Sequence, residues 1–260
     1  MANRLGSEAE ERAKSHSLIY GRHPVREAAT YDPAGVVAIW VDQALRRDPK
    51  LERLFNKLKK QGVTFYRVKR RELDEMVGGA NHQGVVLSYR GAAVRGEAEL
   101  NDLLDSARDP LLLVLDRVQD PHNLGACLRS AAAAGAAGVV APRDHAASLS
   151  PAVHKVAAGA VQSVPFFQVT NLARALANMQ QAGLVTIGAA GDGAQTLYSL
   201  ELRGAIALVM GGESEGLRRL TRKNCDYVAA IPMPGSIESL NVAVAAGVVL
   251  FEAVRQRSNC

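Results

Sequence analysis

The sequence predicts an α/β protein in which a small first domain precedes a larger domain built on a parallel sheet. From Leu111 onward, short and almost wholly apolar runs alternate with segments of helical character. A shorter series of the same kind fills residues 16–90, and a polar, acidic stretch separates the two series. Apolar strands that alternate with helices indicate a parallel sheet covered on both faces. We therefore expect a linker at 91–107, whose end could form a short helix, and a second domain at 108–260.

The first domain follows a charged tail, residues 1–15, which lacks periodic apolar positions and is expected to be disordered. Pro24 suits the first turn of a helix. Asp48 predicts the start of a second helix, which Gly62 ends. Strands are expected at 36–41, 63–68 and 83–89.

The second domain is predicted as a regular alternation of elements. Strands are expected at 111–116, 138–141, 164–169, 184–190, 205–210 and 227–231. Helices are expected at 123–135, 151–161, 171–182, 216–224 and 240–256. Asn123, Ser150 and Asn171 stand where they can cap helices, and Gly183 suits a helix end.

Composition narrows the class of protein. No apolar run approaches the roughly 20 residues of a membrane span, and the charged N-terminus does not resemble a signal peptide. Three widely spaced cysteines among 260 residues favour a reducing, cytoplasmic setting and offer no zinc-ligand spacing. Residues 1–90 hold 17 Lys and Arg against 11 Asp and Glu, whereas the remainder holds 14 against 15. This asymmetry favours a polyanionic partner such as nucleic acid, and an ordinary solvated surface explains it equally well.

Three glycine-rich loops follow predicted strands of the second domain, at 188–193, 211–216 and 232–236. Ligands of open α/β sheets bind beyond the carboxyl ends of strands, and glycine lets the backbone approach a ligand closely. We expect these loops to form a pocket for a flat ligand such as an adenosine derivative. The missing GxGxxG and GxxxxGK[ST] motifs argue against Rossmann dinucleotide and P-loop sites.

Arg129 is the only charged residue in the predicted helix 123–135, among small and apolar neighbours. A charge in such surroundings needs an anionic partner or a site into which it reaches. An ion pair with Glu213 or Asp116 is the structural interpretation, and a place in a site is the functional one. His122, in a loop beside proline, is interpreted as solvated rather than as a base.

Three motifs together resemble those of the SpoU (TrmH) branch of the SPOUT methyltransferases. They are Asn123-x-Gly125-x-x-x-Arg129, the loop Gly211–Gly216, and Ser239-Leu240-Asn241-Val242. The likeness extends over residues 17–258 and includes YGRHPV, NHQGVV, DPHNLGACLRSA, KVAAGA and VTNLAR. Enzymes of this family transfer a methyl group from S-adenosylmethionine to a ribose 2′-hydroxyl of RNA. The longer segments are similar to those of the members that modify a guanosine in 23S rRNA. This guanosine lies in the P-loop of the peptidyl-transferase centre, which is an RNA loop and unrelated to the nucleotide-binding motif above.

The resemblance implies a catalytic α/β-knot domain with a deep trefoil knot, at 108–260. It also implies a ribosomal-protein-L30e-like domain that helps to hold 23S rRNA, at 16–90, and a homodimer. From the residues themselves we expect no membrane span and no metal site, and no DNA partner is expected. It makes Arg129 catalytic, with Asn123 and Glu213 positioning Arg129 and the ribose, and Ser239 and Asn241 shaping the third loop. It places the cofactor against Gly211, Ile231 and Leu240, with Ala189, Gly191 and Met233 nearby. Ser214 and Ala243 depart from the family pattern, which often has glycine and serine there.

Three alternatives accompany this interpretation. A 2′-O-methyltransferase that acts on tRNA or another rRNA loop shares the chemistry, but the tRNA type resembles only the catalytic part. An RNA-binding protein without catalysis is disfavoured by the intact Asn123, Arg129, Glu213, Ser239 and Asn241. A nucleotide-dependent dehydrogenase is disfavoured by the missing GxGxxG.

Overall fold

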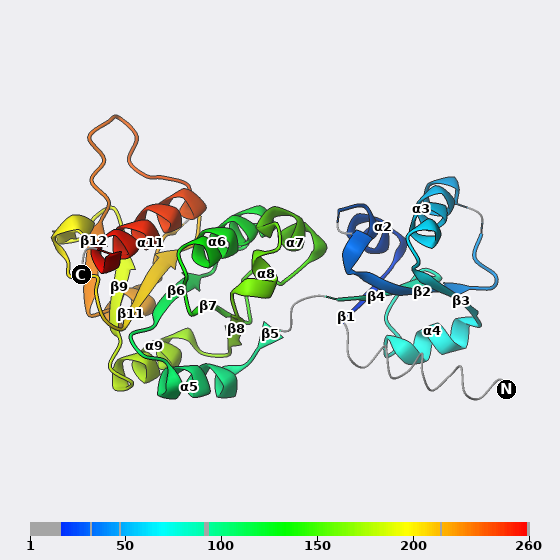
Figure 1. Cartoon of the computed structure of the whole chain (residues 1–260), viewed down its shortest axis with the longest axis horizontal. Helices are drawn as coiled ribbons and strands as arrows, with labels where there is room; N and C mark the ends of the chain where they lie inside the picture. Colours follow the sequence, from blue (N-terminus) through cyan, green and yellow to red (C-terminus); the bar gives the residue numbers. More distant parts are fainter. Residues whose placement is uncertain (1–16, 32, 47, 91–93, 214, 259–260) are drawn as a thin grey trace. The chain divides into compact units, whose positions relative to one another are not determined.

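The computed structural model describes residues 17–31, 33–46, 48–90, 94–213 and 215–258. The chain divides into two compact units between residues 91 and 92. The predicted disordered tail, 1–15, lies outside the described residues. Each unit is an α/β layer structure with its own sheet (Figure 1).

The first unit has a four-stranded sheet in the order β1-β4-β2-β3. Its strands are β1 (Ser17–Tyr20), β2 (Val36–Asp42), β3 (Thr64–Val68) and β4 (Val85–Tyr89). Strand β4 is antiparallel to β1 and β2, whereas β2 and β3 are parallel. Its helices are α2 (Arg22–Tyr31), α3 (Pro49–Lys60) and α4 (Arg70–Met76), with a 3-10 turn at Pro33–Gly35.

Helices α2 and α3 cover one face of this sheet and α4 covers the other (Figure 1). Helix α3 begins where the sequence predicts, because the Asp48 carboxylate accepts the backbone N–H groups of Lys50 and Leu51 at 3.0 and 3.2 Å. Helix α4 was not predicted from the sequence. Leu73 is its only fully buried residue, so the segment has almost no apolar periodicity to detect.

The second unit contains an eight-stranded sheet in the order β10-β12-β9-β11-β6-β7-β8-β5, and every neighbouring pair is parallel. Its strands are β5 (Val94–Arg95), β6 (Leu111–Asp116), β7 (Gly138–Pro142), β8 (Phe166–Val169), β9 (Val185–Ala189), β10 (Gln195–Thr196), β11 (Ile206–Gly211) and β12 (Tyr227–Ala230). Its helices are α5 (Glu97–Ser106), α6 (Pro121–Ala133), α7 (Pro151–Ala157), α8 (Ala160–Ser163), α9 (Leu172–Gln181), α10 (Arg219–Lys223) and α11 (Val242–Ser258), with a 3-10 turn at Leu197–Ser199. The predicted parallel sheet is thus confirmed.

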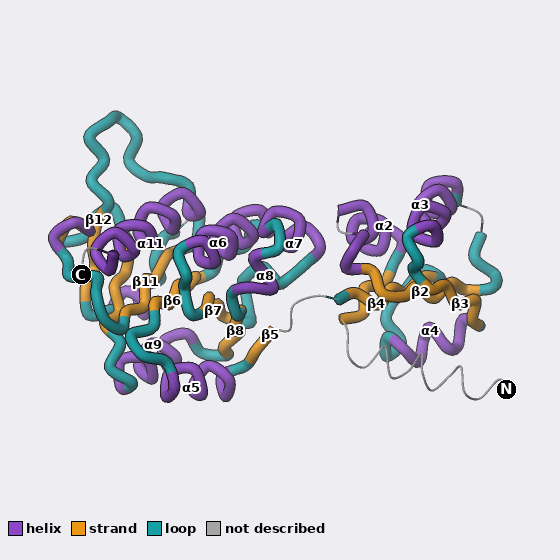
Figure 2. Tube along the Cα trace, viewed as in Figure 1, coloured by secondary structure: helices purple, strands orange, loops and turns teal. Residues whose placement is uncertain are grey.

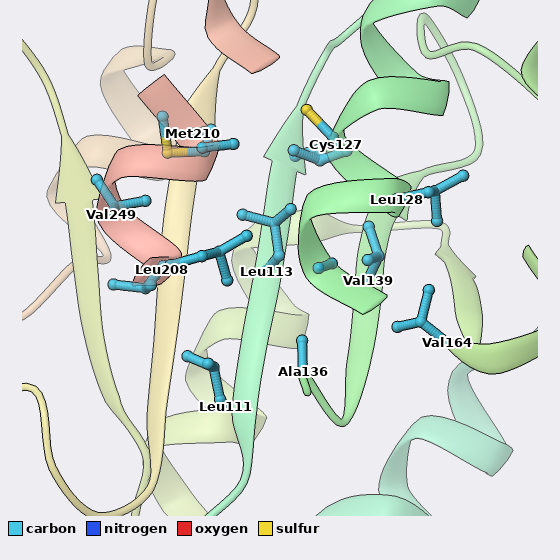
Figure 3. Close-up of a cluster of buried hydrophobic side chains, with 14 of the residues drawn as sticks. Leu111, Leu113, Cys127, Leu128, Ala136, Val139, Val164, Leu208, Met210 and Val249 are labelled. Atoms are coloured by element: carbon cyan, nitrogen blue, oxygen red, sulfur yellow. The ribbon is translucent and has the colours of Figure 1, made fainter. Parts of the chain in front are cut away.

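Alternate residues of strands β6, β7 and β11 enter two separate cores. On β6, Leu111 and Leu113 pack with α6 and α11, as Figure 3 shows around Leu128 and Val249. Leu112 and Val114 face the opposite side and pack with α5 and α9. Burial of both faces explains why these strands read as continuous apolar runs.

Three expectations need correction. Val94–Ser106 were expected in a linker that could end in a short helix, but they belong to the second unit: β5 pairs with β8, and the ten-residue α5 packs against the sheet. The expected helix 151–161 is broken at Ala158 and Gly159, whose φ values are 48° and 90°. Asn123 does not cap a helix, because α6 already begins at Pro121 and is capped by Asp120, whose carboxylate accepts the N–H of His122 at 3.0 Å. The trefoil knot stays a prediction.

Candidate active site

A cavity of about 530 Å³ lies at the carboxyl ends of β9, β11 and β12. Its walls come from the segments that follow these strands and from the start of α11, including the long loop between β12 and α11 (Figure 2). All six residues predicted to contact the cofactor line it: Ala189, Gly191, Gly211, Ile231, Met233 and Leu240. Glu213, Ser239 and Asn241 line it as well. Because β12, β9 and β11 are sheet neighbours, segments distant in sequence converge on one site.

Glycine is required in the loop that follows β11. A Cβ atom on Gly211 would lie 2.0 Å from the carbonyl carbon of Gly216, and one on Gly212 would lie 2.6 Å from the carbonyl oxygen of Arg117. No side chain fits at such distances. The loop therefore folds back on its own backbone, with a bridge between Gly212 and Gly216, and presents backbone to the cavity.

Asn123 joins the walls of the cavity through its side-chain amide. Its Nδ2 donates to Glu213 Oε1 at 2.8 Å, and its Oδ1 accepts from Asn241 Nδ2 at 3.0 Å. Asn241 in turn accepts the backbone N–H of Ala243 at 2.9 Å, which fixes the first turn of α11. Three predicted residues from three separate segments thus form one hydrogen-bonded chain at the rim. Ser239 lies in the same wall.

Arg129 is placed elsewhere. It lies on the exposed face of α6 and does not line the cavity. Among the residues that the structure describes, none forms a hydrogen bond or ion pair with its side chain. The structural interpretation of Arg129 was an ion pair with Glu213 or Asp116, and neither ion pair forms among the described residues. Asp116 pairs instead with Arg218 Nε at 2.6 Å, and Glu213 accepts a hydrogen bond from Asn123.

Arg117 is the first residue after β6, and its carbonyl oxygen lies close to Gly212. Its φ of 64° is in the left-handed region, which costs energy for a residue other than glycine. Its Nε atom is buried and lacks a hydrogen-bond partner among the described residues. No sequence pattern indicates this strained position.

The two described cysteines are buried or half-buried thiols rather than nucleophiles. Burial raises the pKa of Cys127 to about 12, with a further contribution from the charge of Glu213. Burial likewise raises the pKa of Cys225 to about 12. The described residues include no group of three or more His, Cys, Asp or Glu side chains that could hold a metal ion. Within the same residues, no helix is long and apolar enough to cross a membrane.

Comparison with known proteins places this site in a family. Residues 110–251 match the model of the SpoU rRNA Methylase family, and residues 18–93 match the model named RNA 2′-O ribose methyltransferase substrate binding. The chain belongs to the SpoU rRNA methylase family. The SpoU match contains the whole cavity and the Asn123 hydrogen bonds.

Relatives in this family match along almost the entire chain. The 23S rRNA (guanosine-2′-O-)-methyltransferase RlmB of Pseudomonas syringae pv. tomato is 51% identical over 241 residues, which are 92% of this chain and 96% of that protein. RlmB of Vibrio cholerae serotype O1 is 48% identical over 243 residues, which are 94% of this chain and 98% of that protein. The crystal structure of the SpoU methyltransferase AviRb from Streptomyces viridochromogenes, in complex with the cofactor AdoMet, superposes with a TM-score of 0.59. It is 26% identical, and the match covers 95% of this chain and 92% of that one.

The structure adds cavity residues that sequence reasoning missed. Gly212, Gly216, Glu238, Val242 and Ala245 also line the cavity. Gly212 and Gly216 belong to a loop that the sequence did single out. Glu238 lies in a polar segment without a local signal, so only the folded position of the loop before α11 reveals it. Ser214 lies outside the described residues.

Proposed function

We propose that this SpoU-family chain transfers the methyl group of S-adenosylmethionine to the ribose 2′-hydroxyl of the P-loop guanosine in 23S rRNA. The observation that carries the proposal is the cavity at the sheet edge, rimmed by the hydrogen-bonded residues Asn123, Glu213 and Asn241. The RlmB relatives support the choice of RNA, because they match the chain through both units at 48–51% identity.

The cavity fits S-adenosylmethionine in size and chemistry. A volume of about 530 Å³ is within the range of roughly 300–1,000 Å³ of small-molecule sites. Ile231 and Leu240 offer apolar surface to a flat base, and backbone groups of the glycine-containing walls offer hydrogen bonds to its edge. Glu213 and Glu238 bring negative charge to a site that would hold a sulfonium cation. When bound, S-adenosylmethionine supplies a methyl group that needs no further activation.

The protein has to orient the ribose and help its hydroxyl to lose a proton. In this proposal Asn123 and Glu213, which are hydrogen-bonded to each other at the rim of the cavity, orient the ribose. Arginine is effectively always protonated, so Arg129 is not a simple base. We assign it to an adjoining RNA phosphate, which accepts the proton of the hydroxyl while the guanidinium stabilises the charge.

The position of Arg129 supports a homodimer with composite sites. Helical spacing places Ala126, Arg129 and Ala133 on one face of α6, outside the core of the unit. On the neighbouring helix α11, Val244 and Phe251 are 54% and 50% exposed. The two helices approach closely, since a Cβ atom on Gly247 would lie 3.8 Å from Ser130 Oγ. In this proposal a second copy covers the apolar surface, and each copy offers Arg129 to the other's cavity.

Transfer of labelled methyl groups to unmodified 23S rRNA tests the function. The product is mapped by primer extension that stops at 2′-O-methylated nucleotides, with Arg129→Ala in parallel. We expect one stop at the P-loop guanosine and its loss in the variant. Label at another rRNA or tRNA position would overturn the substrate and keep the chemistry. Cofactor binding without transfer to any RNA would support a binding protein, and NAD binding would support a dehydrogenase.

A doubly tagged heterodimer tests the composite site. One subunit carries Arg129→Ala, and the other carries Gly191→Leu, which fills the cavity. If Arg129 acts across the interface, one complete site remains and about half of the wild-type activity is expected. If Arg129 acts on its own subunit, both sites are incomplete and the heterodimer is inactive.

A further inference from the structure

Helix α3 of the first unit carries a row of exposed basic side chains. Lys50, Arg53, Lys57 and Lys60 are all exposed, and their spacing of three and four residues places them along one face of the helix. We call these four residues the α3 stripe. The first and last residues of the stripe are ten positions apart, or about 15 Å along the helix axis.

The positive charge of the first unit is concentrated on this helix. Residues 17–90 have 14 basic and eight acidic residues, and α3 alone has five basic residues and one acidic residue. Helix α4, on the opposite face of the sheet, has two basic and three acidic residues. The excess charge therefore belongs to one side of the unit rather than to its whole surface.

The stripe has no counter-charge within the described part of the chain. None of the ion pairs there involves its four side chains. Asp48, at the start of the helix, holds backbone N–H groups and lies 3.9 Å from Arg22. Glu52 lies on a different face of α3 by helical spacing.

The arrangement is unfavourable for the helix itself. Like charges three or four residues apart on a helix repel one another, and the four residues of the stripe form three such pairs in succession. A ligand that carries closely spaced negative charges would convert this repulsion into binding. In duplex DNA, which serves as a scale, one strand places a phosphate about every 3.4 Å of axis, so the stripe matches on the order of four phosphates.

A membrane surface fits less well than RNA. A helix that lies on a membrane needs an apolar face to insert. The apolar residues of α3 are already used within the unit, where Leu58 belongs to the core and Leu54 and Phe55 pack against it. Apart from Pro49 at its start, the exposed residues of the helix are polar or charged.

We propose that the α3 stripe is the surface by which the first unit holds the phosphate backbone of the rRNA substrate. This inference rests on the proposed function and adds the place and the mode of binding. The contact is electrostatic and carries no sequence information, so it strengthens binding without selecting the guanosine. The α4 side of the sheet makes no such contact.

Two matched triple variants of the full chain test the proposal. One carries Lys50→Gln, Arg53→Gln and Lys57→Gln in α3. The control carries Lys69→Gln, Arg70→Gln and Arg71→Gln at the start of α4, which removes the same charge from the other face. Binding of an unmodified 23S rRNA fragment is measured by filter binding or anisotropy at several salt concentrations, with S-adenosylmethionine binding and thermal unfolding in parallel.

The stripe variant is expected to bind the rRNA fragment at least about tenfold more weakly at 0.1 M salt, with a slope of log K against log salt reduced by about 2. The control should retain the wild-type slope. Equal effects of the two variants, or an unchanged slope in the stripe variant, would overturn the proposal. Failure of the proposed function is a separate result, because it would appear as absent methyl transfer by the wild-type chain.

Discussion

The side-chain amide of Asn123 donates a 2.8 Å hydrogen bond to Glu213, which follows it by 90 positions in the chain. The same side chain accepts a hydrogen bond from Asn241, a further 28 positions on. An amide is suited to this place because it can donate to a carboxylate and accept from another amide at once. Neither a carboxylate nor an aliphatic side chain can do both.

Asn123→Asp should therefore break the hydrogen bond that links Asn123 to Glu213 in the wall of the cavity. The new carboxylate cannot donate to Glu213 and repels it. Loss of a hydrogen bond to a charged group costs about 1.5–3 kcal/mol, which corresponds to a fall of roughly 10- to 100-fold in kcat/KM. Initial rates of methyl transfer measure the effect. Asn101→Asp, on the exposed surface of α5, is the control and should match wild type. Normal rates in Asn123→Asp would show that these hydrogen bonds are not needed.

Gly191→Leu should block the cavity without damaging the fold. A Cβ atom at this position would meet only the carbonyl oxygen of Glu238, at 3.7 Å, and Gly191 lines the cavity. We expect S-adenosylmethionine binding to be lost in calorimetry while the unfolding temperature stays near the wild-type value. Gly235→Leu lies outside the cavity lining, has open space around the new side chain, and should bind normally. Binding by both variants would place the cofactor elsewhere.

Arg117→Gly should stabilise the protein. The left-handed conformation at φ 64° costs roughly 1–2 kcal/mol for an ordinary residue, and glycine avoids it. Glycine also adds entropy to the unfolded chain, so the net gain is smaller, about 0–1 kcal/mol. Denaturant unfolding measures this difference. Arg108→Gly, at a position outside the left-handed region, should instead lower the stability. A clear loss of stability in Arg117→Gly would mean that packing of the arginine outweighs its backbone strain.

Glu252 should make stability depend on pH at the acidic end. Hydrogen bonds from Arg255 and Gln256 lower the pKa of its carboxyl from an ordinary 4.5 to about 2. The stabilisation is complete above the unfolded pKa, near 4.5, and is lost as pH falls through 2. The stability difference between wild type and Glu252→Gln should thus shrink from pH 5 to pH 2. Glu201→Gln, at an exposed carboxylate, is the control. A difference independent of pH would contradict the lowered pKa.

Much of the second unit could be predicted because its strands are buried on both faces. The run Leu111–Asp116 was expected and found without a shift, since six consecutive buried residues leave a continuous apolar signal. The cavity was also predictable in outline, because strand ends and glycine-rich loops are visible in the sequence. All six residues expected near the cofactor do line one cavity.

The remaining features depend on tertiary contacts that leave no local signal. Strand β5 has only two residues, both exposed, and exists because it pairs with β8. Asn123 looked like a helix cap, but Asp120 and Pro121 begin the helix earlier and leave the amide free to bridge the cavity walls. The exposed position of Arg129 follows from the exact start and rotation of α6, which spacing alone does not determine.

The cavity draws one of its walls from the segment before α11 and from the start of that helix, which comes last in sequence among the helices and strands of the described residues. Proteins are synthesised from the N-terminus at about 5–20 residues per second, and domains generally fold as units in that order. The first unit is complete about 150 residues before α11 begins, so on the order of 10–30 seconds of synthesis separate it from the last wall of the cavity. During that interval the nascent chain presents the basic α3 without any site for the methyl donor. If the α3 stripe binds RNA as proposed, the nascent chain can bind RNA before its site for the methyl donor exists, whereas methylation must wait until α11 has been synthesised and has folded.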